Sequence, residues 1–306
     1  MKSFIVTGGL GFIGSNLANE LSKKNKVIII DDLSSGKISN LKKNKNITII
    51  NQKLQNLKII DKKVDGIFHL AAQPSVPLSI KNTYQSTSNN ILSSLKIFDI
   101  AKLQDVPILY ASSSAIYGNI SKGDDRKKNF DILSPYALDK LYLENLAALY
   151  FDLFNISSVG MRFFNVYGPN QDENNPYSGV IAKFINLGKR NKTLTVYGGH
   201  QTRDFIYISD VVKLCILMMN KMLKNKKKFY NFFNVGTGKE NSINHLIEIL
   251  SSLNKKKFQI KKTQIPLGDP VRSMGDIKKI TKFLNLKKNF YIPLDIGLKK
   301  TILSYE

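Results

Sequence analysis

Residues 4–14 read Phe4-Ile5-Val6-Thr7-Gly8-Gly9-Leu10-Gly11-Phe12-Ile13-Gly14, an apolar run followed by a glycine-rich stretch. Beyond it, Leu17, Ala18 and Leu21 recur at helical spacing. Glycine leaves room where the backbone must turn sharply, approach a pyrophosphate and pack a helix against a strand. The N-terminus of the following helix offers unpaired N–H groups to phosphates. The stretch therefore predicts a strand–loop–helix unit that binds a dinucleotide.

A carboxylate, Asp31, directly follows the second apolar run at residues 27–30. In this position it accepts hydrogen bonds from the adenosine ribose hydroxyls and repels a 2′-phosphate. The alternative is that Asp31 or Asp32 caps a turn. We favour the first interpretation, which predicts NAD rather than NADP as the cofactor.

Further apolar runs recur through the first half of the chain, at residues 47–50, 66–70 and 107–110. Such runs are typical of parallel strands covered by helices on both faces. The sequence therefore predicts an α/β fold, a Rossmann-like doubly wound parallel sheet with a smaller C-terminal substrate lobe. The expected domain limits are 1–171 for the NAD-binding domain, with 205–236 returning to the sheet, and 172–204 and 237–306 for the lobe.

Two polar segments carry the candidate catalytic groups. Residues 112–118, with Ser113, lie just beyond the fifth apolar run, where ligands bind in an open parallel sheet. Residues 134–140 begin a long predicted helix, with Ser134 as its N-cap and Pro135 in its first turn. Tyr136 and Lys140 are then one turn apart on the same face.

The spacing of Tyr136 and Lys140 suits proton transfer. A phenol has a pKa of about 10, and a neighbouring ammonium is expected to lower it. Tyr136 can then remove the proton from a sugar hydroxyl, Lys140 can hold the nicotinamide ribose, and Ser113 can orient the hydroxyl. On ordinary helices such a pair is structural, but the glycine loop and the serine run favour catalysis.

Taken together, these segments resemble the UDP-glucose 4-epimerase and UDP-N-acetylglucosamine 4-epimerase group of extended short-chain dehydrogenases. The resemblance runs essentially end to end, through residues 7–14, 69–73, 112–118, 136–140, 162–169, 201–205 and 268–269. It implies a tightly held NAD and oxidation of C4 of a UDP-hexose to a ketone, which turns over and is reduced on its opposite face. It also implies a homodimer formed through long helices.

The resemblance assigns roles to residues of this chain. The implied cofactor-binding residues are Gly8, Gly11, Phe12, Ile13, Gly14, Asp31, Asp32, Leu70, Ala71, Ala72, Tyr136 and Lys140. The implied substrate-binding residues are Ser114, Asn165, Arg203, Arg272 and Ser273. A guanidinium binds phosphate bidentately, which suits Arg203 to a diphosphate.

Three positions and one segment bear on which reaction the enzyme catalyses and which sugar it uses. Related dehydratases and decarboxylases carry Asp or Glu where this chain has Ser114 and Ala115, so elimination of water is poorly supported. Ser273 falls where glucose-restricted relatives carry a bulky tyrosine, and residues 177–181 resemble the branch that uses N-acetylated sugars. Two alternatives stay open: another epimerase or reductase of the family, such as UDP-glucuronate 4-epimerase, and a non-catalytic NAD-binding scaffold.

The chain departs from its relatives at two positions. Lys53 replaces an aspartate near adenine, which puts adenine recognition in doubt. Pro266 replaces an arginine that binds phosphate in relatives, so we expect either that Arg272 compensates or that UDP binds more weakly.

The net charge of +23 raises the question of a polyanionic partner. Only five of the 46 basic residues are arginines and the lysines are scattered, which favours biased composition over nucleic-acid binding. The single cysteine, Cys215, excludes an internal disulfide. The three histidines lack metal-ligand spacing, so we expect no metal. No apolar run is long enough to cross a bilayer, and we expect a cytoplasmic protein.

Overall fold

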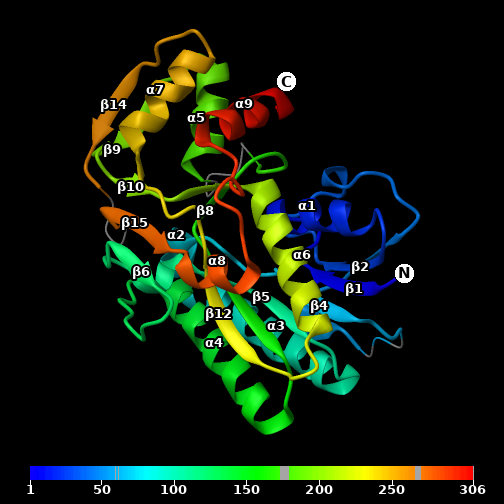
Figure 1. Cartoon of the computed structure of the whole chain (residues 1–306). Coiled ribbons are helices and arrows are strands. Elements are labelled where there is room, and N and C mark those ends of the chain that lie inside the picture. Colours follow the sequence, from blue (N-terminus) through cyan, green and yellow to red (C-terminus); the bar gives the residue numbers. More distant parts are fainter. Residues whose placement is uncertain (59, 61, 173–178, 266–269, 306) are drawn as a thin grey trace. The chain divides into compact units, whose positions relative to one another are not determined.

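The structure of this protein is a computed structural model that describes residues 1–58, 60, 62–172, 179–265 and 270–305. Figure 1 labels the helices and strands of the chain. The described chain divides into two compact units. The first unit comprises Met1–Ser113, Ser134–Arg162 and Val212–Phe233, and the second comprises Ser114–Leu133, Phe163–Val211 and Asn234–Glu306. That these units are the expected NAD-binding domain and substrate lobe stays a prediction.

A seven-stranded sheet forms the centre of the first unit in the described part of the chain, in the order β12-β7-β5-β4-β1-β2-β3. Its strands are β1 (Ser3–Thr7), β2 (Lys26–Asp31), β3 (Ile47–Asn51), β4 (Gly66–His69), β5 (Ile108–Ser113), β7 (Ser158–Phe163) and β12 (Tyr230–Val235). β1 pairs in parallel with both β2 and β4, so the strand order reverses beside β1. Ligands bind at the carboxyl ends of the strands at such a switch point. The predicted doubly wound sheet is confirmed.

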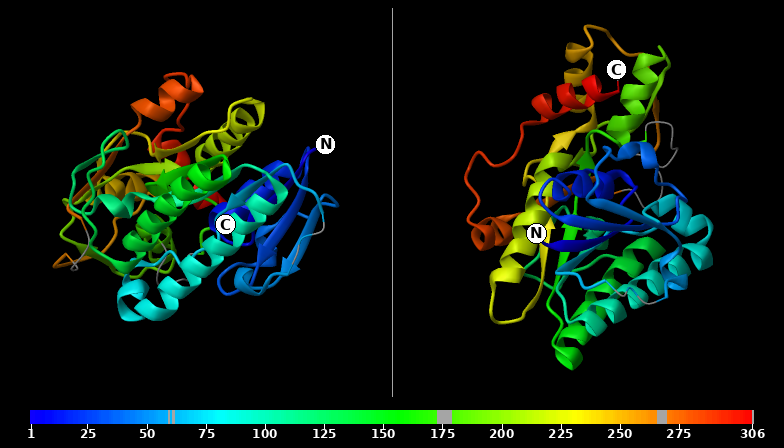
Figure 2. Two further views of the ribbon diagram at one scale, coloured as in Figure 1. Left: turned by 90° about the horizontal axis from the view of Figure 1, so that it is seen from below. Right: turned by 90° about the vertical axis from the view of Figure 1, so that its right-hand side faces the viewer.

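Helices cover both faces of this sheet. They are α1 (Phe12–Leu21), α2 (Val76–Lys81), α3 (Thr83–Gln104), α4 (Pro135–Phe154) and α6 (Ile208–Lys224), which starts in the second unit. α3 and α4 lie side by side (Figure 2). Their buried residues share one core cluster with Ile5, Ile67 and Ile108 of the sheet. Successive strand residues face opposite sides, so Ile29 between Ile28 and Ile30 faces away from that cluster.

A buried ion pair ties α4 to the strands beside it. Glu144 on α4 accepts hydrogen bonds from Ser112 Oγ at 2.6 Å and from Arg162 Nε at 2.8 Å and Nη2 at 2.6 Å. The Arg162 side chain is fully buried, and its guanidinium lies 3.9 Å from the centre of the Phe232 ring. Both charges are therefore removed from water but paired.

The second unit contains smaller sheets, in the orders β13-β10-β15-β6, β11-β8 and β14-β9 among the described residues. Their strands are β6 (Lys122–Asp124), β8 (Asn165–Tyr167), β9 (Leu194–Tyr197), β10 (Thr202–Arg203), β11 (Phe205–Tyr207), β13 (Asn241–Ser242), β14 (Ile260–Thr263) and β15 (Arg272–Asp276). Its further helices are α5 (Val180–Lys189), α7 (Ile243–Leu253), α8 (Lys278–Leu284) and α9 (Leu294–Ser304).

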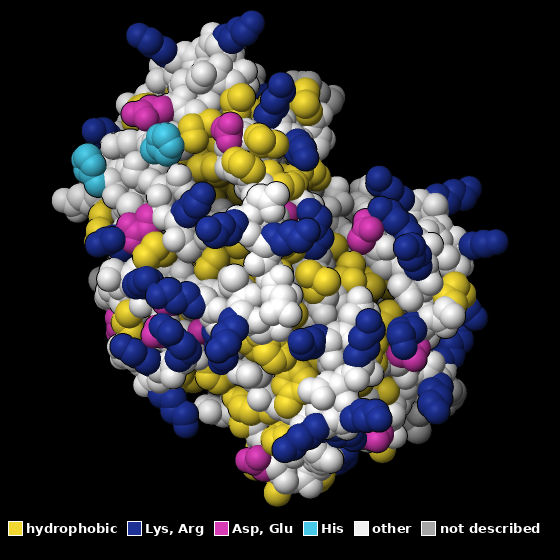
Figure 3. Space-filling view, viewed as in Figure 1, with side chains coloured by type: hydrophobic (Ala, Val, Ile, Leu, Met, Phe, Trp, Pro, Cys, Tyr) yellow, Lys and Arg dark blue, Asp and Glu magenta, His cyan; other side chains and the backbone are white. Residues whose placement is uncertain are grey.

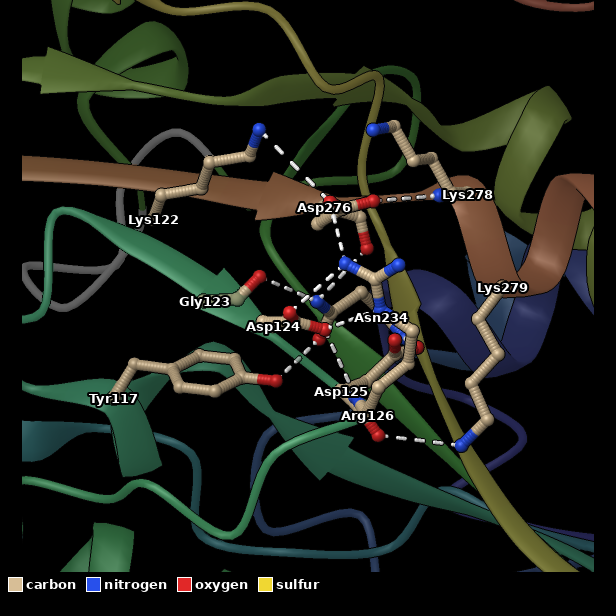
Figure 4. A network of polar contacts seen from close by, with 10 residues as sticks. All are labelled: Tyr117, Lys122, Gly123, Asp124, Asp125, Arg126, Asn234, Asp276, Lys278 and Lys279. Carbon is tan, nitrogen blue, oxygen red and sulfur yellow. Dashed lines mark hydrogen bonds and ion pairs between the residues drawn. The ribbon is translucent and has the colours of Figure 1, made fainter.

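A single buried amide joins several segments of this unit (Figure 4). Asn234 Nδ2 donates to the carbonyl oxygens of Gly123 and Asp276, at 2.9 and 3.1 Å. Asn234 Oδ1 accepts from the Tyr117 hydroxyl at 2.8 Å, and the Asn234 N–H donates to Asp125 at 2.8 Å. Every polar group that this side chain offers is used, so it fixes β6 and β15 beside the helical turn Ser114–Tyr117.

Candidate active site

The glycine loop between β1 and α1 is packed backbone against backbone. Gly8 has φ +65°, and a Cβ atom there would lie 2.8 Å from the Cα of Ala71. A Cβ atom on Gly14 would lie 2.0 Å from the carbonyl oxygen of Gly8. Side chains are excluded from both positions, so the backbone at the start of α1 carries no side chain there.

The groups that meet this loop fit a dinucleotide. α1 begins at Phe12, so the N–H groups of Phe12, Ile13 and Gly14 belong to a first turn that lacks intrahelical acceptors. Anions bind at such a terminus. Gly11, which precedes the helix, is extended, with φ −74° and ψ −179°. The residues present therefore fit the pyrophosphate of NAD.

Asp31, the last residue of β2, and Asp32, which follows it, differ in their surroundings. The Asp31 carboxylate is 9% exposed and accepts from the N–H groups of Leu10 at 2.9 Å and Leu33 at 3.0 Å. It is thereby held against the glycine loop, with further lone pairs for ribose hydroxyls. Asp32 accepts from the N–H of Ser34 at 3.0 Å and from its hydroxyl at 2.5 Å, so Asp32 caps a turn.

The segment after β4 is held to the same loop. The N–H groups of Leu70 and Ala71 both donate to Thr7 Oγ1 at 3.2 Å, and Ala72 follows them. Thr7 Oγ1 lies 2.8 Å from His69 Nδ1. Burial, with a contribution from Lys140, lowers the pKa of His69 to about 3, so this histidine is neutral at physiological pH.

The three candidate catalytic side chains lie together in the first unit. Ser134 caps α4 by accepting from the N–H of Ala137 at 3.2 Å, with Pro135 in the first turn, which confirms the predicted helix start. The Ser113 side chain hydrogen-bonds that of Tyr136. Lys140 Nζ lies 5.6 Å from the centre of the Tyr136 ring and donates to the carbonyl oxygen of Ala111 at 2.8 Å.

The electrostatics of this group differ from the expectation. Burial raises the pKa of Tyr136, and Asp139 adds to the rise, while the hydrogen bond from Ser113 opposes it. Burial lowers the pKa of Lys140 to about 8, against the effect of Asp139. The expected lowering of the Tyr136 pKa is therefore wrong for this pocket, because burial outweighs any effect of the nearby ammonium.

Sequence reasoning missed two buried polar residues beside this group. Asp139 Oδ2 accepts from Asn90 Nδ2 at 2.8 Å, and Asn90 Oδ1 accepts from the N–H of Gln73 at 2.8 Å. Asp139 and Asn90 are each 5% exposed. A signal was present, since Asp139 is three residues after Tyr136 and thus shares its face of the helix.

The candidate substrate residues belong to the second unit. Ser114 starts the turn Ser114–Tyr117, and Asn165 starts β8 and pairs with Phe205 of β11. Arg203 is 9% exposed and donates to the carbonyl oxygen of Thr202 at 2.9 Å. Arg203 and Ser273 are partners in the parallel β10–β15 pair, so their side chains share one face.

Arg272 lies on the opposite face of that strand pair. Its register partner is Thr202 rather than Arg203. Its guanidinium binds both carboxylate oxygens of Glu240, at 2.8 and 2.9 Å. The structure therefore does not bring Arg272 together with Arg203, contrary to the expected compensation for Pro266. Pro266 itself, residues 268–269 and residues 177–178 lie outside the described residues, and Lys53 directly precedes the short turn Leu54–Asn56.

Other kinds of site find no support in the described part of the chain. No cluster of three or more His, Cys, Asp or Glu side chains suited to a metal occurs there. None of the helices formed by the described residues combines the length and apolarity needed to span a membrane. On the face drawn in Figure 3, basic side chains are scattered among other residue types.

Comparisons with known proteins agree with this geometry. Residues 4–236 match the NAD dependent epimerase/dehydratase family. The chain is 36% identical to the UDP-N-acetylglucosamine 4-epimerase of Methanobrevibacter ruminantium M1, solved with UDP-N-acetylmuramic acid, with a TM-score of 0.92 over 99% of this chain and 98% of that one. It is 28% identical to the UDP-glucose 4-epimerase of Thermotoga maritima, with a TM-score of 0.89 over 99% and 98%.

A third relative acts on an acidic sugar. The UDP-glucuronate 4-epimerase of Thermodesulfobacterium geofontis is 30% identical, over 99% of this chain and 95% of that protein. The family match covers the glycine loop, Asp31 and the Tyr136–Lys140 helix, which are the features that fit a dinucleotide. The chain therefore belongs to the NAD dependent epimerase/dehydratase family, and it is an enzyme whose cofactor is NAD.

Proposed function

We propose that this enzyme is a UDP-hexose 4-epimerase that works through a 4-keto sugar and accepts N-acetylated as well as plain hexoses. The observation that carries the proposal is the buried group of Ser113, Tyr136 and Lys140 beside the glycine loop that fits NAD. The relatives that use UDP-N-acetylglucosamine, UDP-glucose and UDP-glucuronate are 4-epimerases by name, which supports the same reaction here.

Each member of the buried group has a proposed part in the reaction. NAD, when bound, would supply the hydride acceptor and donor for C4. Tyr136 takes the proton of the 4-hydroxyl and, once the keto sugar has turned over, gives it back to the same oxygen, while the hydride returns to the opposite face of C4. Ser113, which hydrogen-bonds Tyr136, orients that oxygen. Lys140 stabilises the phenolate of Tyr136 and holds the nicotinamide ribose.

The state of Lys140 limits the pH range of this chemistry. Its pKa of about 8 leaves the side chain mostly charged at pH 7 and neutral well above pH 8. Burial raises the pKa of the Tyr136 phenol, so the phenolate needs the Lys140 ammonium nearby as a stabilising counter-charge. Proton transfer by Tyr136 therefore depends on Lys140, whose pKa burial has lowered to a value close to physiological pH.

The residues around Ser113 favour epimerisation over elimination. The next two positions, Ser114 and Ala115, provide no carboxyl group that could remove or donate a proton at a second carbon of the sugar. Without such a group, elimination from the keto sugar is disfavoured and reduction of the ketone is the expected next step. This supports an epimerase rather than a dehydratase.

The second unit supports an N-acetylated substrate. Arg203 is proposed to bind the diphosphate, with Asn165 beside the uridine diphosphate. Ser273 shares the face of Arg203, and its small side chain would leave room for an N-acetyl group. The 36% identical relative is itself a UDP-N-acetylglucosamine 4-epimerase, which supports this choice of sugar.

We also propose a homodimer through α3 and α4. Large apolar side chains on these helices are left exposed, namely Leu92, Leu103, Leu138, Leu149 and Leu153, which are 48%, 74%, 56%, 50% and 63% exposed. α3 and α4 lie side by side, so these residues offer an apolar surface that a second copy would cover. Sedimentation of the purified protein tests this, and a monomer at micromolar concentration would contradict it.

A second candidate function is UDP-glucuronate 4-epimerase, favoured by the 30% identical relative. Proton NMR distinguishes the two. The protein is incubated without added NAD with UDP-glucose, UDP-N-acetylglucosamine and UDP-glucuronate in turn. We expect the galacto isomers of the first two, with no net NADH. Turnover of the glucuronate alone would replace our substrate assignment, and no turnover of any sugar, even with NAD added, would contradict the proposed function.

A further inference from the structure

We propose that Asp139 is a positioning residue for the reaction: through Asn90 it holds the helical turn that carries Tyr136 and Lys140, and its negative charge stabilises the Lys140 ammonium. This proposal rests on the proposed function, since it assigns a role relative to the Tyr136–Lys140 pair. Asp139 itself is given no contact with substrate or cofactor.

The first support is a series of buried hydrogen bonds that reaches Asp139 through Asn90, whose main-chain carbonyl accepts from Ser94 and whose side-chain amide donates to Asp139. Thr7 Oγ1 meets His69 Nδ1 at 2.8 Å, and His69 Nε2 meets Ser94 Oγ at 3.3 Å. Ser94 Oγ donates to the carbonyl oxygen of Asn90 at 2.7 Å, and Asn90 Nδ2 donates to Asp139 Oδ2 at 2.8 Å. The series thus connects the end of β1, beside the glycine loop, to the catalytic turn of α4.

The direction of these hydrogen bonds is determined. Thr7 Oγ1 already accepts from two N–H groups, so its hydroxyl proton goes to His69 Nδ1. His69 is neutral and therefore carries its proton on Nε2, which donates to Ser94. Ser94 in turn donates to Asn90. The series from Thr7 thus ends at the main-chain carbonyl of Asn90, and the Asn90 side chain donates separately to Asp139.

Asn90 also fixes the loop that follows β4. Its Oδ1 accepts from the N–H of Gln73 at 2.8 Å, and its Nδ2 lies 3.3 Å from the Gln73 carbonyl oxygen. One amide therefore links the segment after Ala72 to the turn between Tyr136 and Lys140. A substitution of Asp139 therefore removes the hydrogen-bond partner of Asn90 on α4 but leaves the bonds between Asn90 and Gln73 in place.

The second support is the charge around Lys140. In the first unit, the Lys140 ammonium donates to the Ala111 carbonyl oxygen on β5 at 2.8 Å and lies 5.6 Å from the centre of the Tyr136 ring on α4. Its charge lowers the pKa of His69 on β4, and Asp139 directly precedes it on α4. Among these, Asp139 is the carboxylate, and it raises the pKa of both Lys140 and Tyr136. A buried ammonium is costly unless a counter-charge is near, which is what Asp139 supplies.

The variant Asp139→Asn separates the charge from the hydrogen bond. Its amide oxygen can still accept from Asn90, but the negative charge is gone. Asp152→Asn is the matched control, because Asp152 lies on the same helix and is exposed. Asp139→Glu restores the charge at nearly the same place and should recover at least half of any effect.

The test uses two readouts on the NAD-loaded enzyme. The first is the phenolate fraction of Tyr136, followed by NMR of tyrosines labelled at Cζ and assigned with Tyr136→Phe. The second is the pH dependence of kcat. In Asp139→Asn we expect about tenfold more Tyr136 phenolate at pH 10 and an alkaline limb of kcat that moves down by about one pH unit. Asp152→Asn should match the unchanged protein in both.

The outcomes separate the possibilities. A uniform loss of kcat with neither titration moved would overturn the proposal and leave Asp139 a structural residue. If Asp139→Asn does not fold, Asp139→Glu and Asn90→Ala decide, since both keep the charge: a Tyr136 titration shifted by more than about half a pH unit in either would contradict the charge assignment. If no sugar is turned over, the proposed function fails, but the Tyr136 titration still tests Asp139.

Discussion

Replacing Glu144 by alanine is expected to destabilise the protein strongly without touching the reacting groups. The substitution removes the acceptor of three hydrogen bonds and leaves the guanidinium of Arg162, which is fully buried, without its carboxylate. Breaking a buried pair from one side costs about 3–5 kcal/mol in the free energy of unfolding. The ring of Phe232 below the guanidinium offsets part of that cost, so we expect the lower half of the range.

The assay is urea unfolding followed by circular dichroism, with thermal melting as a second measure. For a chain of 306 residues, about 3 kcal/mol corresponds to a fall in Tm of about 5 °C. The matched control is Glu240→Ala, whose arginine partner Arg272 has a side chain that is 56% exposed. That exposed pair should contribute less than about 1 kcal/mol. Equal losses for the two variants, both near 1 kcal/mol, would refute the reasoning.

Four further predictions follow from the site. Tyr136→Phe should bind NAD and UDP-sugar normally but lose about 10²–10⁴-fold in kcat, measured by NMR of the product, because only proton transfer is removed; near-normal turnover would show that another group is the base. Gly14→Ala should weaken NAD binding by more than about tenfold, or 1.4 kcal/mol, by calorimetry, whereas Gly11→Ala, whose Cβ would meet its nearest neighbour at 3.3 Å, should cost less. The kcat of the unchanged enzyme should fall above about pH 8, as Lys140 loses its proton, and a flat profile to pH 9.5 would contradict this. Acid should destabilise the protein through His69, because the pKa of this residue falls from 6.5 in the unfolded chain to about 3 in the folded protein. Between pH 6.5 and pH 3 the unfolded chain therefore binds one more proton than the folded protein, and the free energy of unfolding drops by about 1.4 kcal/mol per pH unit. His69→Gln should reduce this slope in urea titrations at a series of pH values.

The fold could be predicted because its signals are local. Each apolar run that was expected as a parallel strand became one, and the order reverses beside β1, where the glycine loop lies. The start of α4 could also be predicted, since Ser134 and Pro135 specify it within one turn. These features depend on residues close together in sequence.

The details that were missed depend on packing between distant segments. The contact between Asn90 and Asp139 spans 49 positions and exists only because α3 and α4 lie side by side. The orientation of Arg272 follows from the register of β10 and β15, where a difference of one residue reverses the face. The direction in which the pKa of Tyr136 shifts depends on how deeply the ring is buried, and burial cannot be predicted from the motif.

The two hydrogen bonds that Asp31 accepts have a consequence for engineering. To admit a 2′-phosphate, a designer would replace this carboxylate with a neutral or basic side chain. The same carboxylate, however, anchors the N–H groups of Leu10 and Leu33, so alanine or arginine there would loosen the loop that surrounds the pyrophosphate. Asparagine keeps one acceptor oxygen and removes the charge. A switch of this enzyme to NADP should therefore begin from Asp31→Asn, with the basic group introduced at a neighbouring position rather than at 31 itself.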